Sequence, residues 1–172
     1  DFDKATFDAV KKALDGNVRW MGSHSNGSRV QEYMAKVEAT VAANLPVLEA
    51  EAVYLHSVRE KIDAAKQKLT EAAVGASKSK IDQQRRWCTT HLGRGDQAKV
   101  LQARESLVKA MEEQRTVLLQ TPAGETVLRE AAGFLAELDV NFAQLKLTQE
   151  AVSYANKLKS QLKWVDNSLK RK

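Results

Sequence analysis

The residues best suited to chemistry in this 172-residue chain are the single cysteine, Cys88, and the histidines His24, His56 and His91. Cys88 and His91 are three residues apart and would lie on one side of a helix, but a nucleophilic dyad also needs a third group that orients the base. We therefore interpret them as a half-buried thiol beside a surface imidazole. The ligand spacing of a metal site and the glycine-rich loop of a phosphate site are both missing from the sequence. We predict a protein that is not an enzyme and needs no metal or cofactor.

Arg94, Gly95 and Asp96 spell a tripeptide that some integrin ligands use. Two of these residues also have a structural use, because Gly95, like Gly93, relaxes the backbone and Asp96 can cap the helix that follows. Three-residue matches arise often by chance. An adhesin-like ligand that acts through these three residues is therefore kept only as an alternative.

Composition restricts the elements that can position these residues. With 8 Gly, 2 Pro and 43% hydrophobic residues, the chain has little turn chemistry for strands, which excludes an all-β fold. No apolar run approaches the roughly 18 residues that a transmembrane segment needs. We expect a soluble chain, and because its first residue is Asp1 we expect a processed or trimmed N-terminus, with an exported location left open.

Apolar residues recur every three or four positions, which is typical of amphipathic helices. The periodicity predicts four helices, over 1–17, 28–74, 80–119 and 121–170. Pro46 is expected to kink the second helix, and Gly75 with the residues up to Ser79 is expected to form the turn that ends it. Gly93 and Gly95 are expected to bend the third helix without reversing it, because at about 1.5 Å per residue the three long helices then match in length.

We therefore predict an all-α fold in a single domain, 1–172. It is an elongated, antiparallel, coiled-coil-like three-helix bundle with the short N-terminal helix packed against it. The plan resembles the long three-helix bundles of spectrin-type repeats, of secretion-system and surface proteins, and of the peripheral stalks of membrane complexes. The resemblance is one of architecture, which by itself implies no activity.

The stretch from Arg19 to Gly27 lacks helical periodicity and is expected to be a loop at one end of the bundle. An alternative is that Trp20 and Met21 close the end of the core. Arginine, tryptophan and methionine are enriched at protein interfaces. We predict a contact site for a protein partner at Arg19, Trp20, Met21, His24 and Arg29.

The pattern Arg-Trp-x3-His occurs twice, beginning at Arg19 and at Arg86. We find no supporting similarity in the residues around the two occurrences. We interpret the match as chance and not as a duplicated hairpin.

The net charge of +5 is carried by the C-terminal region, where seven basic residues from Lys146 onward oppose Glu150 and Asp166. In the predicted bundle this terminus lies at the same end as the turn after residue 74. We predict an anion-binding basic end that comprises Lys78, Lys80, Arg85, Arg86, Lys163, Lys170, Arg171 and Lys172. A simpler interpretation is that these cations complement helix dipoles and keep the chain soluble.

These observations favour a non-enzymatic helical scaffold, a rigid rod whose two ends contact protein partners. An alternative from another class is a module that docks through the basic end onto an anionic surface, either acidic lipid headgroups or nucleic-acid backbone. The oligomeric state is open, since alanine-rich helix faces permit close approach of another helix.

Overall fold

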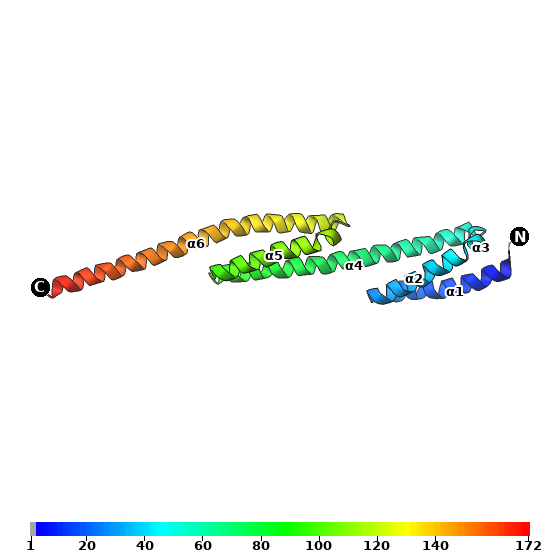
Figure 1. The fold of residues 1–172 in the computed structure, drawn as a ribbon, viewed down its shortest axis with the longest axis horizontal. Coiled ribbons are helices and arrows are strands. Elements are labelled where there is room, and N and C mark those ends of the chain that lie inside the picture. The colour runs from blue at the N-terminus through cyan, green and yellow to red at the C-terminus, as the bar shows by residue number, and fades with distance from the viewer. Residues whose placement is uncertain (1–2) are drawn as a thin grey trace. The chain divides into compact units, whose positions relative to one another are not determined.

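The computed structural model describes residues 3–172, so the part of the predicted first helix that falls on Asp1 and Phe2 lies outside the described residues. The described part forms six helices, which confirms the all-α class (Figure 1). They are α1 (Lys4–Ser23), α2 (Gly27–Ala43), α3 (Leu45–Glu49), α4 (Ala52–Gly93), α5 (Gln97–Leu118) and α6 (Pro122–Lys170). The described residues up to Ala73 form one compact unit and Val74–Lys172 form another, each around a core of its own.

The N-terminal unit consists of α1, α2, α3 and the first half of α4. Its core takes apolar side chains from all four helices: Phe7, Leu14, Val18, Met21, Val30, Val37, Val41, Leu48, Leu55, Val58, Ile62 and Ala65. The first half of α4 runs antiparallel to α2, because Lys66 pairs with Glu38 at 2.9 Å and the Leu69 side chain lies 3.6 Å from the position of a Cβ on Gly27.

The predicted continuous helix over 28–74 is wrong. Pro46 has no N–H to donate to the Ala42 carbonyl, and its ring crowds the preceding turn, so α2 ends at Ala43 and Pro46 falls in the first turn of the next helix. Asn44 then leaves the helical region, with φ −121° and ψ 23°, and the short α3 follows before α4 begins at Ala52. The chain therefore reverses around residues 50–51, where the sequence predicted a kinked but unbroken helix.

The predicted turn at Gly75 is also wrong, because α4 passes through it without interruption. A helical glycine is disfavoured by only about 1 kcal/mol. The serines that resemble a stop signal have hydrogen-bond partners inside the helical structure. Ser77 is buried and donates to the Gln114 side chain at 2.8 Å, and the Ser79 hydroxyl donates to the Gly75 carbonyl at 3.1 Å.

The chain reverses instead at Gly93–Asp96, where the sequence predicted a kink in a helix over 80–119. Gly95 adopts φ +68°, a conformation that favours glycine. Asp96 then caps α5, as predicted, and its carboxylate accepts a hydrogen bond from the Lys99 backbone N–H at 3.1 Å. A full reversal at this point separates α4 from α5 and removes the long third rod.

The second half of α4, α5 and the first half of α6 pack together in the C-terminal unit. Their shared core consists of Val74, Ile81, Cys88, Val100, Ala103, Leu107, Leu118, Val127, Ala131 and Leu138. Arg104 and Asp139 form a two-pronged pair at 2.7 and 3.0 Å, which ties α5 to α6. The predicted last helix over 121–170 is confirmed, and Thr121 caps it by accepting a hydrogen bond from the Gly124 N–H at 3.0 Å.

The first helices of the two units share one register. Phe7, Leu14 and Met21 are buried in α1, and the buried residues Val74, Ile81 and Cys88 follow them in α4 at a constant interval of 67 residues. Seven of the 21 residues from 4 to 24 are identical to their equivalents from 71 to 91.

The second helices also match, at an interval of 70 residues. The buried pairs are Val30 with Val100, Val37 with Leu107, and Leu48 with Leu118. The Arg-Trp-x3-His pattern, interpreted above as chance, therefore marks equivalent helix positions in the two units, and we call their shared three-helix arrangement the repeat.

Gly124 lies where α5 passes into α6, and a Cβ built there would stand 1.9 Å from the Leu118 carbonyl oxygen. We expect Gly124→Ala to lower the free energy of unfolding by about 3 kcal/mol, because the overlap involves rigid backbone. Gly133→Ala in the same helix is the control, since its Cβ would meet no atom within 4 Å, and we expect it to raise stability by about 0.5–1 kcal/mol. Urea denaturation followed by circular dichroism measures both. Equal effects of the two substitutions would contradict the described packing.

Candidate functional site

The residues predicted as a loop at Arg19–Gly27 lie mostly in helix. The first helix, predicted over 1–17, runs on to Ser23, and only His24, Ser25 and Asn26 lie between α1 and α2. The helix continues because Val18 and Met21 extend the buried stripe that Leu14 belongs to. We call the end of this pair of helices the hairpin tip, defined by Trp20, His24, Asn26, Arg29 and Tyr33.

Three aromatic rings stack across the hairpin tip. The centre of the His24 ring lies 5.7 Å from the centre of the Trp20 ring and 5.3 Å from that of the Tyr33 ring. The planes of the His24 and Tyr33 rings are nearly parallel, at 8° to each other. The Lys36 ammonium lies 4.9 Å from the Tyr33 ring centre on the same side of α2. Trp20 is 54% exposed although its ring is held in the stack. The sequence predicted either a partner contact or closure of the core for Trp20 and Met21. Met21 closes the core, with 2% of its surface exposed, whereas Trp20 faces solvent.

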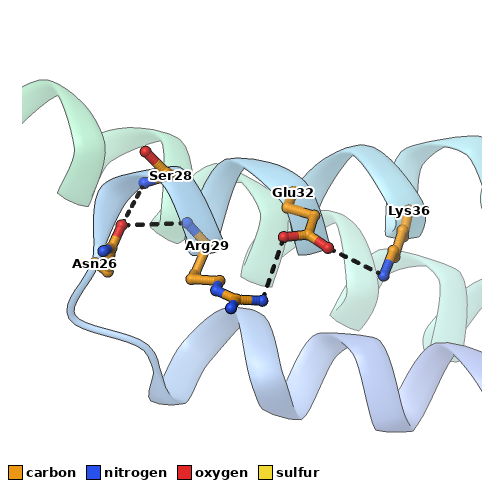
Figure 2. Close-up of polar contacts among 5 residues, drawn as sticks. All are labelled: Asn26, Ser28, Arg29, Glu32 and Lys36. Carbon is orange, nitrogen blue, oxygen red and sulfur yellow. Dashed lines mark hydrogen bonds and ion pairs between the residues drawn. The ribbon is translucent and has the colours of Figure 1, made fainter.

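Polar groups order the start of α2 beside the stack (Figure 2). The Asn26 side-chain oxygen accepts hydrogen bonds from the backbone N–H groups of Ser28 at 2.9 Å and Arg29 at 3.4 Å. Figure 2 shows the Arg29 and Lys36 side chains both directed at Glu32, at 3.7 and 3.4 Å. Because both ion pairs are exposed, they add little to stability.

A groove of about 560 Å³ lies next to the hairpin tip, between α1 and α4. Val18, Met21 and Ala65 contribute apolar lining, and Arg19 and Lys68 are among the cations that line it. The predicted residue Arg19 therefore borders the groove and takes no part in the stack. The contribution of α4 was missed by the sequence reading, because Lys68 is 49 residues away along the chain.

The C-terminal unit has a related arrangement at the end of α4. The Trp87 ring stacks on the His91 ring at 5.7 Å with an interplanar angle of 16°, and Trp87 is 47% exposed. Both residues lie 67 positions after Trp20 and His24. Each unit thus presents a half-exposed indole on an imidazole, one helical turn apart, at the end of its first helix.

The Cys88 thiol is enclosed in the core of the C-terminal unit. Burial raises its pKa, with a smaller opposing effect from the Arg104 charge, so the thiol is kept in its protonated form. His91 is engaged by the Trp87 ring. Among the described residues, no three histidine, cysteine or acidic side chains are grouped so that they could hold a metal ion. No helix formed by residues 3–172 is long and apolar enough to cross a membrane.

The predicted basic end is not assembled, because it depended on a turn at Gly75. Lys78, Lys80, Arg85 and Arg86 lie in the second half of α4, whereas Lys163, Lys170, Arg171 and Lys172 lie at the end of the chain. The Gln149 side chain of α6 donates to the Gly95 carbonyl at 2.8 Å, which aligns that residue with the α4–α5 reversal. At about 1.5 Å per residue, Lys163 lies about 21 Å beyond this level and Lys78 about 25 Å before it.

The Arg94-Gly95-Asp96 tripeptide forms the reversal between α4 and α5. The Gly95 carbonyl accepts the Gln149 hydrogen bond, and the Asp96 carboxylate is occupied as the cap of α5. Gly95 and Asp96 are half-buried and Arg94 is exposed. These contacts engage the tripeptide in the fold.

Comparison of the chain with known protein families, curated proteins and solved structures finds no match. Function therefore has to be argued from the geometry of the chain itself. The feature that this geometry repeats is the indole–imidazole stack, which occurs at one register in both units.

Asn26 and Asp96 occupy equivalent cap positions at the start of the second helix of each unit. We expect Asn26→Ala and Asp96→Ala each to lower the free energy of unfolding by about 1 kcal/mol, because backbone donors lose their acceptor. Ser25→Ala, at an exposed position beside the first cap, should change stability by less than about 0.5 kcal/mol. Thermal unfolding of the three variants measures this. A loss with Ser25→Ala as large as with Asn26→Ala would show that the cap is not the cause.

Proposed function

We propose that the protein is a non-enzymatic helical scaffold that binds protein partners through the exposed helix ends of its repeated three-helix units. The observation that carries the proposal is the pair of half-exposed indoles, Trp20 and Trp87, at one register in the two units. A tryptophan that served only the core would be covered by it. Tryptophan is also among the residue types that dominate binding energy at protein interfaces.

The stacks favour binding because they hold the indoles before a partner arrives. His24 and Tyr33 restrict Trp20, and His91 restricts Trp87. A side chain that is already ordered loses less conformational entropy when a partner covers it. The groove between α1 and α4 is a separate concave surface near the hairpin tip, lined by Val18, Met21 and Ala65 together with charged residues such as Arg19, and Trp20 is not part of its lining.

The state of the chemistry-bearing residues supports a non-enzymatic role. Cys88 is enclosed and its raised pKa disfavours the thiolate. Two of the histidines stack on tryptophans, and the third, His56, contacts Glu60 at 3.2 Å on an exposed helix surface. Each of the three histidines therefore contacts another side chain of the chain itself.

The test is affinity capture from an extract of the source organism, quantified by mass spectrometry, with the wild-type chain and the Trp20→Ala/Trp87→Ala variant as baits. We expect partner proteins retained by the wild type to fall at least about 30-fold with the variant, since truncation of such anchors removes 2 kcal/mol or more of binding energy. Val53→Ala is the matched control, because Val53 is 85% exposed and belongs to neither stack. Its capture profile should equal that of the wild type.

The proposal fails if no protein is enriched by the wild type, or if the double variant retains every enriched protein. Circular dichroism of the double variant separates lost binding from lost folding. We expect its helix content to be unchanged, because both indoles lie at the surface.

The docking of a basic surface onto anionic lipid is a second candidate, and it now rests on the end of α6. Its cations are Lys163 near the end of α6 and Lys170, Arg171 and Lys172 at the terminus, and they can attract acidic headgroups without insertion of an apolar helix face. If this candidate holds, binding to vesicles of phosphatidylserine should fall steeply between 50 and 200 mM salt, since exposed charges are screened. Replacing the four cations by glutamine should remove the binding. A flat salt response in vesicle co-sedimentation would reject it.

A further inference from the structure

The part of α6 that follows Gln149 is not covered by the other helices of the C-terminal unit. Gln149 lies level with the α4–α5 reversal, and the helix continues from there to Lys170, beyond the ends of α4 and α5 (Figure 1). Large apolar side chains on this stretch face solvent, with Tyr154 66% and Leu162 68% exposed. Most helical stability in proteins comes from the packing of an apolar face, and an exposed apolar stripe of this length marks a surface that a partner covers.

The stripe has the register of the first helix of the repeat. In the first helix of each unit, the core positions lie 13, 10, 6 and 2 residues before the tryptophan and 1 residue after the tryptophan. These positions are Phe7, Val10, Leu14, Val18 and Met21 in α1, Val74, Ser77, Ile81, Arg85 and Cys88 in α4, and Ala151, Tyr154, Leu158, Leu162 and Val165 in α6. In α1 and α4 they are buried or half-buried against the other two helices of the unit, whereas in α6 the same positions are exposed.

Two further features agree with this register. A basic residue stands directly before the tryptophan in all three helices, as Arg19, Arg86 and Lys163. Both α4 and α6 end six residues after it, at Gly93 and Lys170. The third helix differs in having Ser168 where the first two have the stacking histidine.

We propose that the segment from Ala151 to Lys170 acts as a first helix of this repeat, and that the occupant of its exposed stripe is an antiparallel helical hairpin of the kind that α5 and the first half of α6 form on α4. In both complete units the covering hairpin follows the first helix directly in sequence, as α5 and the first half of α6 follow α4. The proposal rests on the shared register and is independent of the partner-binding function proposed above.

The distribution of charge and aromatic residues disfavours two other occupants. A second copy of the same tail would bring together two segments that each carry seven basic and two acidic residues from Lys146 onward, and like charges along paired helices repel. A helix that lies in a membrane surface has its tryptophan on the apolar face. At about 100° per residue, Trp164 points roughly 120° away from the line through Leu158 and Val165.

The test extends the 172-residue chain by a hairpin of known fit. A second copy of residues 94–149, which contain the reversal, α5 and the first half of α6, is fused after Lys170 in place of the last two residues. Hydrogen exchange of the segment 151–170 is then compared between the fused and the original chain. We expect exchange to slow at least tenfold in the fusion, because the stripe becomes buried.

Matched variants of the fusion show whether the register is the cause. Leu158→Lys, at the position of Leu14 and Ile81, should abolish the protection, whereas Ser153→Lys, on the opposite side of the helix, should preserve it. Unchanged exchange in the fusion overturns the proposal. Two other results also overturn the proposal. One is that the original chain dimerises in analytical ultracentrifugation and Leu158→Lys abolishes the dimer. The other is that the original chain binds phosphatidylserine vesicles and Leu158→Lys abolishes this binding.

Discussion

The continuity of α4 through Gly75 is the constraint on which the rest of the structure depends. A helix that ended there would have to bury one apolar stripe, whereas the uninterrupted helix buries its first half in one core and its second half in another. The α4–α5 reversal at Gly95 follows, because the second half of α4 needs α5 and α6 to cover it. Continuity is maintained because Gly75 is tolerated within the helix and the buried Ser77 hydroxyl bonds to Gln114.

Features with local causes could be predicted from the sequence. The helical class, the extent of α6 and the caps Asp96 and Thr121 all depend on residues close together in the chain. The positions of the reversals could not, because both glycine sites carry signals that can end a helix and only packing decides which of them does. Gly95 adopts φ +68° and Gly75 remains helical. At Pro46 the sequence predicted a kink where the helix in fact ends, because the apolar periodicity continues across the proline.

The candidate site was predicted in its residue types and not in its geometry. Trp20, His24 and Arg29 lie together at the hairpin tip, but in helices and not in a loop, and Tyr33 was missed because it joins the stack from the second helix. The basic end failed as a cluster because it depended on the wrong turn. The repeated Arg-Trp-x3-His pattern was the signal that pointed to both stacks, and comparison of the buried positions around it would have revealed the repeat.

The enclosed thiol of Cys88 makes the C-terminal unit chemically traceable. Cys88 occupies the position that Met21 holds in the first unit, with no measurable exposed surface. Because Cys88 is enclosed, an alkylating reagent can reach it only when the surrounding helices separate, and the thiolate that forms on exposure is the species that reacts. Its labelling rate therefore reports the opening of that core, since Cys88 is the one cysteine among these 172 residues.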